Sequence, residues 1–492
     1  MMTNKISFIS LLSVVLGMTL LGGCGNASPT DPPAPLNPAA LNAANINMVF
    51  VVSEDLAYHS TDDINLTTAN LTNRGLQRSL LMASFLQEHV LGSKPVTAIY
   101  ALEPSTHLQA AGQYPDMVGL ETIQQFALLN QIAMSSANNA PYTGNSFPVN
   151  VAYSSAASLP ENVAQPLIDC GSCQGLDFRD ANNDNEALLN AIATAKLPGF
   201  YVFSAPWETT DSLLSSINKL EGYDLTLPSS YAGPNYVYAI SITPTGSASL
   251  ITYDAALNPP STYPAPALPR DVGQACQAKP FRLKVTGGVA GAVVPAGINT
   301  DETVYLIRHA EAHPVPYFED GNYVGAGQWR ALELPNALQG KISPDMVYSI
   351  DPAQVTPGAE SSEGNAYSYV RVSLTVEPYA IANRLPLYLA TDFELLAQNP
   401  PELATTASDH IFKGGRFSHH TLLVAWEHDH IPPTVNALLA SYHGGQSVPN
   451  WPGNDYDSIW TVKLDHNGNV SVDNNLCEGI NSAALPVAAP QF

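Results

Sequence analysis

Basic residues are scarce in this sequence. Lys and Arg together number 19 of 492 residues, against 43 Asp and Glu, and the formal net charge is −24. Nucleic acids and anionic membrane surfaces are bound through clusters of basic side chains. The composition therefore argues against either as the main partner, although a few well-placed arginines can still form a pocket for a small anion. Charged residues of both signs make up only 13% of the chain, so its polar surface depends mainly on Asn, Ser, Thr and Gln.

Long apolar runs are also lacking. The run from Ile6 to Leu21 is short for a membrane span and has the length of a signal-peptide core. It ends in Leu21-Gly-Gly-Cys24, which resembles the lipobox of bacterial lipoproteins. The resemblance implies a signal peptide over residues 1–24, lipidation of Cys24, and anchoring in the bacterial cell envelope, at the outer membrane or facing the periplasm. An ordinary secretory signal is the alternative. Residues 25–45 are rich in Pro, Ala and Asn and predict a flexible linker.

Cysteine is rare, with five residues in all. Four lie outside the signal segment, and an even number in an exported protein suggests two disulfides. Cys170 could pair with Cys173 and Cys276 with Cys477, although spacing alone leaves the connectivity open. A single Cys-x-x-Cys gives poor support for a zinc site, so we expect no metal.

An internal repeat is present. Three pairs of segments match in the same order, at separations of 252, 248 and 222 residues: Gly75–Arg78 with Gly327–Arg330, Ile99–Pro104 with Val347–Pro352, and Gly199–Phe203 with Thr421–Ala425. Ordered matches of this kind predict a tandem duplication. We expect a first copy over residues 46–257 and a second over 301–470. A connection over 258–300 would join them, and a C-terminal tail would cover 471–492.

Each copy contains short apolar, β-branched runs typical of buried parallel strands. The first copy has them at 48–52 and 200–204, and the second at 304–307 and 422–426. Amphipathic helical segments separate these runs, which predicts an α/β fold with helices on both faces of the sheet. In such folds ligands bind beyond the carboxyl ends of the strands.

Residues suited to phosphate chemistry follow two strands of the second copy. Arg308-His-Ala-Glu311 follows the first strand, and His428-Asp429 follows a later one. With Gly327–Arg330, Val347–Pro352 and Arg371–Thr375 between them, these elements resemble the histidine phosphatase superfamily, which includes the phosphoglycerate mutases. The resemblance implies two tandem three-layer α/β/α domains with mostly parallel sheets.

The resemblance also implies a mechanism that needs neither metal nor cofactor. Arg308 and Arg371 would bind the phosphate, His309 would attack phosphorus to form a phosphohistidine, and His428 would stabilise the transition state. The expected activity is hydrolysis of a small phosphomonoester. Asp429 is the first candidate for the acid that protonates the leaving oxygen, and Glu394 and Glu311 are the alternatives.

The first copy lacks these residues. The strand alignment places Ser53 opposite Arg308, Glu54 opposite His309 and Pro206 opposite His428. There is no arginine between Arg78 and Arg179 to stand for Arg371. We therefore expect a non-catalytic first copy. A non-enzymatic surface lipoprotein, with both copies serving as binding or scaffold modules, is the alternative function, and the oligomeric state stays open.

Overall fold

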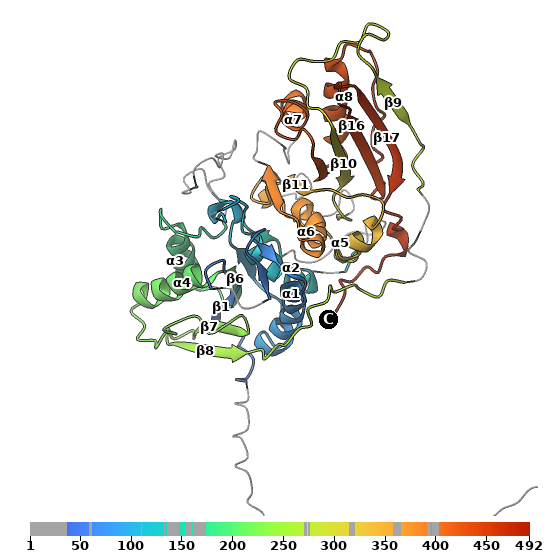
Figure 1. Cartoon of the computed structure of the whole chain (residues 1–492). Helices are drawn as coiled ribbons and strands as arrows, with labels where there is room; N and C mark the ends of the chain where they lie inside the picture. The colour runs from blue at the N-terminus through green and yellow to red at the C-terminus, as the bar shows by residue number, and fades with distance from the viewer. Residues whose placement is uncertain are drawn as a thin grey trace, which may run out of the picture. The chain divides into compact units, whose positions relative to one another are not determined.

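Two mixed β-sheets, each with helices on both faces, make up the chain between Pro38 and Phe492, which forms a single unit (Figure 1). The computed structural model describes residues 37–58, 62–109, 111–131, 133–134, 147–153, 159–160, 174–269, 273, 276–313, 320–357, 366–390, 395 and 403–492. The predictions for Cys24, Cys170, Cys173 and Glu394 fall outside these residues. Among the helices that are described, none combines the length and apolarity needed to cross a membrane.

The first sheet lies in residues 46–257, called the first half. Its strands, in spatial order, are β5 (Val149–Asn150), β4 (Ala98–Ala101), β6 (Gly199–Ala205), β1 (Ile46–Val52), β7 (Tyr236–Ile242) and β8 (Ala248–Asp254). The pairs from β5 to β1 are parallel, and the last two pairs are antiparallel. The short strands β2 (Ile64–Asn65) and β3 (Asn70–Leu71) form a separate hairpin.

The second sheet lies in residues 282–492, called the second half. Its strands, in spatial order, are β14 (Leu387–Ala390), β11 (Met346–Ile350), β15 (Thr421–Trp426), β10 (Glu302–Arg308), β16 (Ser458–Leu464), β17 (Val470–Cys477) and β9 (Arg282–Val285). The pairs from β14 to β10 are parallel and the rest antiparallel. A two-stranded sheet, β12 (Val355–Pro357) with β13 (Ala366–Ser368), stands apart.

The two main sheets share one topology. Numbered along the chain within each half, their six common strands lie in the order 3-2-4-1-5-6, with β9 added at the edge of the second sheet. The predicted α/β fold with mostly parallel sheets is confirmed. The shared order is also what a tandem duplication would produce. The second sheet extends past the predicted limits of the second copy, because β9 lies in the expected connection and most of β17 in the expected tail.

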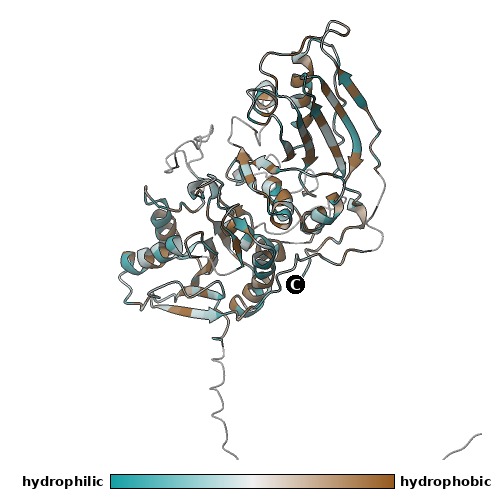
Figure 2. Ribbon diagram, viewed as in Figure 1, coloured by the Kyte–Doolittle hydropathy of each residue, from teal (hydrophilic) through white to brown (hydrophobic). Residues whose placement is uncertain are grey.

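Helices cover both faces of each sheet. In β1 the side chains alternate, so that Val49 and Val51 join one buried cluster while Met48 and Phe50 join another on the opposite face. Figure 2 shows the hydrophobic residues along these strands. The helices of the first half are α1 (Asn73–Phe85), α2 (Val118–Asn130), α3 (Asp184–Ala195) and α4 (Trp207–Leu220); those of the second are α5 (Gly325–Leu338), α6 (Arg371–Asn383), α7 (Ala404–Phe412) and α8 (Ile431–Ser441).

The backbone register corrects the alignment of the two halves by one residue. The Ser53 amide donates to the Ala205 carbonyl at 3.0 Å, and the His309 amide donates to the Trp426 carbonyl at 3.0 Å. The counterpart of His309 is therefore Ser53, and Glu54 comes one position later. The alignment went wrong because an apolar run shows where a strand lies but fixes its register only loosely.

The repeated Gly-x-x-Arg motif has a structural explanation. In α5, a Cβ on Gly327 would lie 2.9 Å from the Glu311 carbonyl oxygen, so only glycine lets the helix approach the loop that follows β10. One turn later, Arg330 binds the Glu311 carboxylate through Nε at 2.9 Å and Nη2 at 2.8 Å. In the first half Arg78 of α1 binds Asp63 in the same way, at 2.7 Å.

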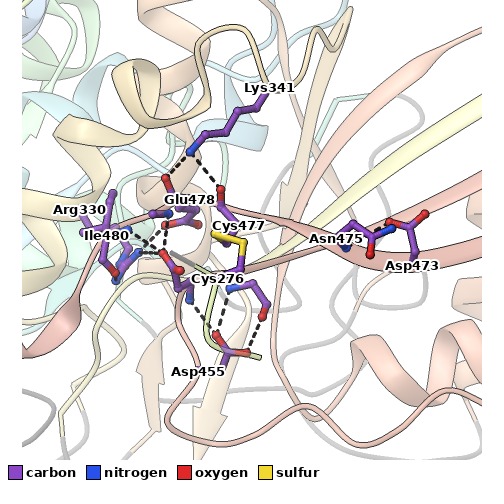
Figure 3. Close-up of a disulfide and its surroundings, with 12 residues drawn as sticks. Cys276, Arg330, Lys341, Asp455, Asp473, Asn475, Cys477, Glu478 and Ile480 are labelled. Carbon is purple, nitrogen blue, oxygen red and sulfur yellow. Dashed lines mark hydrogen bonds and ion pairs between the residues drawn. A yellow bond between two sulfur atoms is a disulfide. The ribbon is translucent and has the colours of Figure 1, made fainter. Parts of the chain in front are cut away.

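A disulfide joins Cys276 to Cys477, as the sequence suggested (Figure 3). It ties the segment before β9 to the end of β17, and the loop that it closes spans 201 residues. Glu478, the next residue, forms an ion pair with the buried Arg330. The Lys341 ammonium donates to the carbonyls of Cys477 and Glu478, so the end of β17 is fastened to α5 and to the loop after it.

The two halves share a buried interface. The side chains of Gln124 and Asn322 exchange two hydrogen bonds, at 2.8 and 2.9 Å. The last residues of the chain reach the first half, where the Gln125 amide donates to the Pro490 carbonyl and the Ser84 hydroxyl donates to the Phe492 carbonyl at 3.4 Å. An apolar cluster spans the contact and is made of Ile64, Leu71, Leu76, Leu80, Val118, Leu332 and Ile381.

Candidate functional site

Arg308 and His309 stand at the carboxyl end of the central strand β10. Arg308 pairs with Trp426 at the end of the parallel strand β15, so both strands deliver their following residues to one edge of the sheet. The His309 Nδ1 lies 2.7 Å from the carbonyl oxygen of Ala310. Because a carbonyl can only accept a hydrogen bond, Nδ1 carries the proton, and the Nε2 lone pair remains available for nucleophilic attack.

Burial keeps His309 neutral. Its side chain is 1% exposed, and this burial lowers the pKa of the imidazole to about 4. Glu427 opposes this shift, whereas the positive charges of Arg371 and Arg308 add to it. A neutral imidazole is the form that can act as a nucleophile.

Helix α6 supplies the second arginine. Arg371 is its first residue, and Thr375 lies one turn later. The Thr375 hydroxyl donates to the Arg371 carbonyl at 2.7 Å and accepts from the Ala310 amide at 2.8 Å. The Arg-x-x-x-Thr pattern thus fastens the start of α6 to the loop that carries His309.

The Arg371 guanidinium is held against Tyr369. Its Nε donates to the Tyr369 hydroxyl at 2.9 Å, and its central carbon lies 4.4 Å from the centre of the ring. Arg308 is held in a similar way by the segment before β16. Its Nη1 donates to the Gly453 carbonyl, and its central carbon lies 3.9 Å from the centre of the Tyr456 ring. These contacts fix the planes of both guanidinium groups.

Glu427, which directly follows β15, links the predicted residues. Its carboxylate oxygens lie 3.4 Å from His309 Nε2, 3.6 Å from Arg371 Nη2 and 3.7 Å from His428 Nδ1. Burial raises the pKa of this carboxyl, but the contact with His428 and the positive charge of Arg308 lower it. The net pKa lies below its ordinary value, so Glu427 is ionised and occupies the positive pocket.

Hydrogen-bond donors remain at this site. Among the described residues, Arg308 Nε is a buried donor without a hydrogen-bond partner, and the buried His428 Nδ1 has no contact closer than the Glu427 carboxylate at 3.7 Å. A buried donor without a partner costs free energy, about 1–3 kcal/mol. An anion bound between these groups would satisfy them.

The three candidates for the general acid differ in their surroundings. Glu311 is fully buried in its ion pair with Arg330, where it supports the fold and does not face His309. Asp429 is 62% exposed in its side chain and lies 3.4 Å from His428 Nε2. Glu394 falls outside the described residues. Glu427, which is none of these three, is the carboxylate in contact with His309 among the described residues.

The first half carries different residues at the positions of His309 and Arg371. Ser53 takes the place of His309. Val118 takes the place of Arg371, because each is the first residue of the helix that packs on the corresponding face of its sheet. After the correction in register, Ser53 and Val118 stand where the second half has His309 and Arg371, and a non-catalytic first copy stays a prediction.

Three residues of the site were not predicted from the sequence. Tyr369 lies two positions before Arg371, and Glu427 lies directly between β15 and His428, so their proximity to the motif was a usable signal. Tyr456 has no such signal, because it comes from a loop that folds back over the strand ends. Together these groups make a neutral, oriented imidazole flanked by two arginines and a second histidine. That arrangement can bind a small anion and attack it.

Comparison with known proteins gives a likeness at the level of structure only. No protein-family model and no curated protein matches the sequence. A candidate phosphohistidine phosphatase, SixA, from Agrobacterium tumefaciens matches at 15% identity and a TM-score of 0.20, covering 34% of this chain and 93% of that one. A phosphoglycerate mutase from Plasmodium falciparum matches at 14% identity and a TM-score of 0.22, covering 39% and 99%.

A candidate α-ribazole-5′-phosphate phosphatase from Escherichia coli matches at 13% identity and a TM-score of 0.22, covering 38% of this chain and 98% of that one. All three are proteins of the histidine phosphatase and phosphoglycerate mutase type. At identities and TM-scores this low, the chemistry of the present site rests on its own geometry.

Proposed function

We propose that the second half is a phosphomonoester hydrolase that works through a phosphohistidine at His309. The observation that supports this most strongly is the neutral, Nδ1-protonated imidazole of His309, flanked by Arg308 and Arg371. Phosphoryl transfer needs chiefly positioning and charge stabilisation, and arginines supply both for phosphate oxygens. The substrate would be a small phosphorylated molecule, because few other basic residues lie nearby to bind a polyanion.

The reaction would have two steps. His309 Nε2 attacks phosphorus, forming the N–P bond while the bond from phosphorus to the leaving oxygen breaks. A carboxylic acid gives its proton to that oxygen. Water then attacks phosphorus, the N–P bond breaks, the carboxylate takes a proton from the water, and inorganic phosphate leaves. Arg308, Arg371 and His428 would bind the phosphoryl oxygens throughout.

Glu427 fits the role of the proton donor. In the free protein it is ionised, because positive groups surround it. A bound phosphate dianion adds negative charge to the same pocket, and a like charge raises the pKa of a carboxyl. Substrate binding would thereby prepare Glu427 to hold a proton near the leaving oxygen.

A non-enzymatic binding module is the second candidate. The observation that favours it is the contact of Glu427 with both His309 and Arg371, since a carboxylate of the chain itself already fills the anion site. A carboxylate fixed there at all times would exclude phosphate.

Trapping of the intermediate distinguishes the two functions. The purified chain, incubated with a radiolabelled aryl phosphate and quenched in alkali, should carry an acid-labile label, and His309→Ala should lose both the label and the hydrolysis by about 10³-fold or more. His419→Ala, which changes a histidine with a 73% exposed side chain, is the matched control. Equal hydrolysis by the parent and His309→Ala would refute the proposal.

We also propose a lipid anchor at Cys24 that holds the protein in the bacterial cell envelope. The support is the Leu21–Cys24 sequence after an apolar run. In cells fed a radiolabelled fatty acid, the parent chain should take up label and sediment with membranes, whereas Cys24→Ser should be unlabelled. An unlabelled parent chain would contradict this proposal.

A further inference from the structure

A second cluster of chemistry-bearing side chains lies in the first half. Asp55, His107 and Asp116 each offer one ligand atom, and these atoms lie within 4.8 Å of one another. His107 Nδ1 is 2.8 Å from Asp116 Oδ2 and 3.8 Å from Asp55 Oδ2. Ligand atoms around a tetrahedral Zn²⁺ lie about 3.4 Å apart when the metal–ligand distances are about 2.0–2.2 Å. The three groups therefore need only small shifts to share one ion.

One ligand atom in this cluster is left without a hydrogen bond. Asp55 Oδ2 is buried and has no hydrogen-bond partner among the described residues. The Asp55 side chain is only 2% exposed, so water does not replace that partner. The other oxygen, Oδ1, is used by the Ala57 amide. A buried carboxylate oxygen that lacks a hydrogen bond and points toward a histidine and a second carboxylate is an atom that a cation would satisfy.

The remaining groups are held in place by their own contacts. Asp116 uses Oδ1 to accept from the Val118 amide at 3.0 Å, which leaves Oδ2 directed at His107. The His107 ring stacks on Phe178 at 3.7 Å between ring centres. Glu208, at the start of α4, adds negative charge that acts on both Asp55 and His107. The cluster is thus oriented and carries an excess of negative charge.

The position of the cluster matches that of the site in the second half. Asp55 lies two residues beyond Ser53, the counterpart of His309, and Asp116 lies two residues before Val118, the counterpart of Arg371. The same edge of the sheet that gathers arginines in one half gathers carboxylates in the other. We propose that the first half binds a divalent transition-metal ion through Asp55, His107 and Asp116.

The donor set indicates the class of ion. One imidazole nitrogen with two carboxylate oxygens suits Zn²⁺ or Mn²⁺, whereas Mg²⁺ and Ca²⁺ prefer sites made entirely of oxygen. This proposal concerns a site separate from His309 and does not depend on the proposed phosphatase activity.

Calorimetric titration of the metal-free full chain with ZnCl₂ and MnCl₂ tests the proposal. We expect one ion per chain, with Asp55→Asn weakening the binding by about 100-fold or more. Asp224→Asn, which changes an exposed acid of the same half, should bind as the parent does. His309→Ala should also bind as the parent does, because it alters only the second half.

A second measurement tests the proposal even if Asp55→Asn folds poorly. A bound ion should raise the melting temperature of the parent chain, and Asp116→Asn should lose that rise while keeping the circular dichroism of the parent. Equal binding by the parent and Asp55→Asn would overturn the proposal, since the three side chains would then form only a hydrogen-bonded group. Loss of the ion in His309→Ala alone would also overturn it and place the ion in the second half.

Discussion

The environment of a single histidine decides what the proposed site can do. The Ala310 carbonyl fixes the tautomer of His309, burial keeps the ring neutral, and the flanking arginines discourage its protonation. An exposed histidine would be partly protonated near pH 6.5 and a poorer nucleophile there. The fold therefore prepares the imidazole before any substrate arrives.

This environment predicts an unusual titration. His309 should stay neutral down to a pH of about 4, because burial outweighs the attraction of Glu427. Glu427→Gln removes a charge that favours the protonated ring and should lower the pKa of His309 further. Histidine NMR titration of the free protein, with His309→Ala to identify the signal, measures both values. A pKa near 6.5 in the parent would contradict the buried setting.

Substrates with different leaving groups distinguish Glu427 from Asp429 as the proton donor. A donor matters most when the leaving oxygen is a strong base, so Glu427→Gln should slow hydrolysis of an alkyl phosphate by about 10²–10⁴-fold. It should slow hydrolysis of p-nitrophenyl phosphate much less, because that leaving group needs no proton. Asp429→Asn should change the two rates by similar small factors. A selective loss in Asp429→Asn would instead assign the proton to Asp429.

At the scale of elements, close contact between α5 and the loop after β10 supports the site. Gly327 makes this contact possible. Arg330 of the same helix binds Glu311, which lies three residues after Arg308 in the loop. Because the same loop carries His309, the position of the helix bears on the geometry of the nucleophile.

Gly327→Ala should therefore destabilise the protein. The added methyl group would lie 2.7 Å from Tyr323 Cβ and 2.9 Å from the Glu311 carbonyl, and such overpacking costs about 1–3 kcal/mol. Urea unfolding measures the loss. Gly273→Ala is the control, since no atom of the described residues lies within 4 Å of the place that its Cβ would take. Equal free energies of unfolding for the two variants would mean that the loop moves to accept the methyl group without loss of stability.

Much of this architecture was predictable because it is local. The strands near 48–52, 200–204, 304–307 and 422–426 follow from apolar runs in the sequence. Arg308, His309 and Arg371 were predictable because they end or begin such elements. The Glu427 contacts and the Asp55 cluster were not, since they depend on how loops after different strands fold toward one another.

At the scale of the molecule, a pair of buried carboxyls joins the two halves. Glu121 of α2 and Glu377 of α6 are both buried at the interface, and each carboxyl acts on the pKa of the other. Burial raises the pKa of Glu121 to about 8, and burial together with the nearby Glu121 raises that of Glu377 well above its usual range. The folded chain therefore keeps these carboxyls protonated at pH values where the unfolded chain has released the protons.

The stability of the protein should fall as the pH rises through this range. The unfolded chain loses these protons near pH 4.5, whereas the folded chain keeps the Glu121 proton up to a pH of about 8. Between these values the folded state binds more protons, so each such group removes about 1.4 kcal/mol of unfolding free energy per pH unit.

Glu121→Gln stays neutral, so its unfolding free energy should depend less steeply on pH in urea unfolding from pH 5 to 8. Glu221→Gln, at an exposed position, should keep the slope of the parent, and an unchanged slope in Glu121→Gln would contradict the raised pKa of Glu121.

The contact of Pro490 and Phe492 with the first half has a consequence for biosynthesis. The first half is translated in full well before these residues are made, yet the Gln125 side chain finds its partner only at Pro490. The apolar cluster around Leu76 and Val118 likewise lacks Leu332 and Ile381 until the second half has been synthesised. A nascent first half therefore exposes part of its future interior while the second half is translated, and it completes its packing only when the late segment docks.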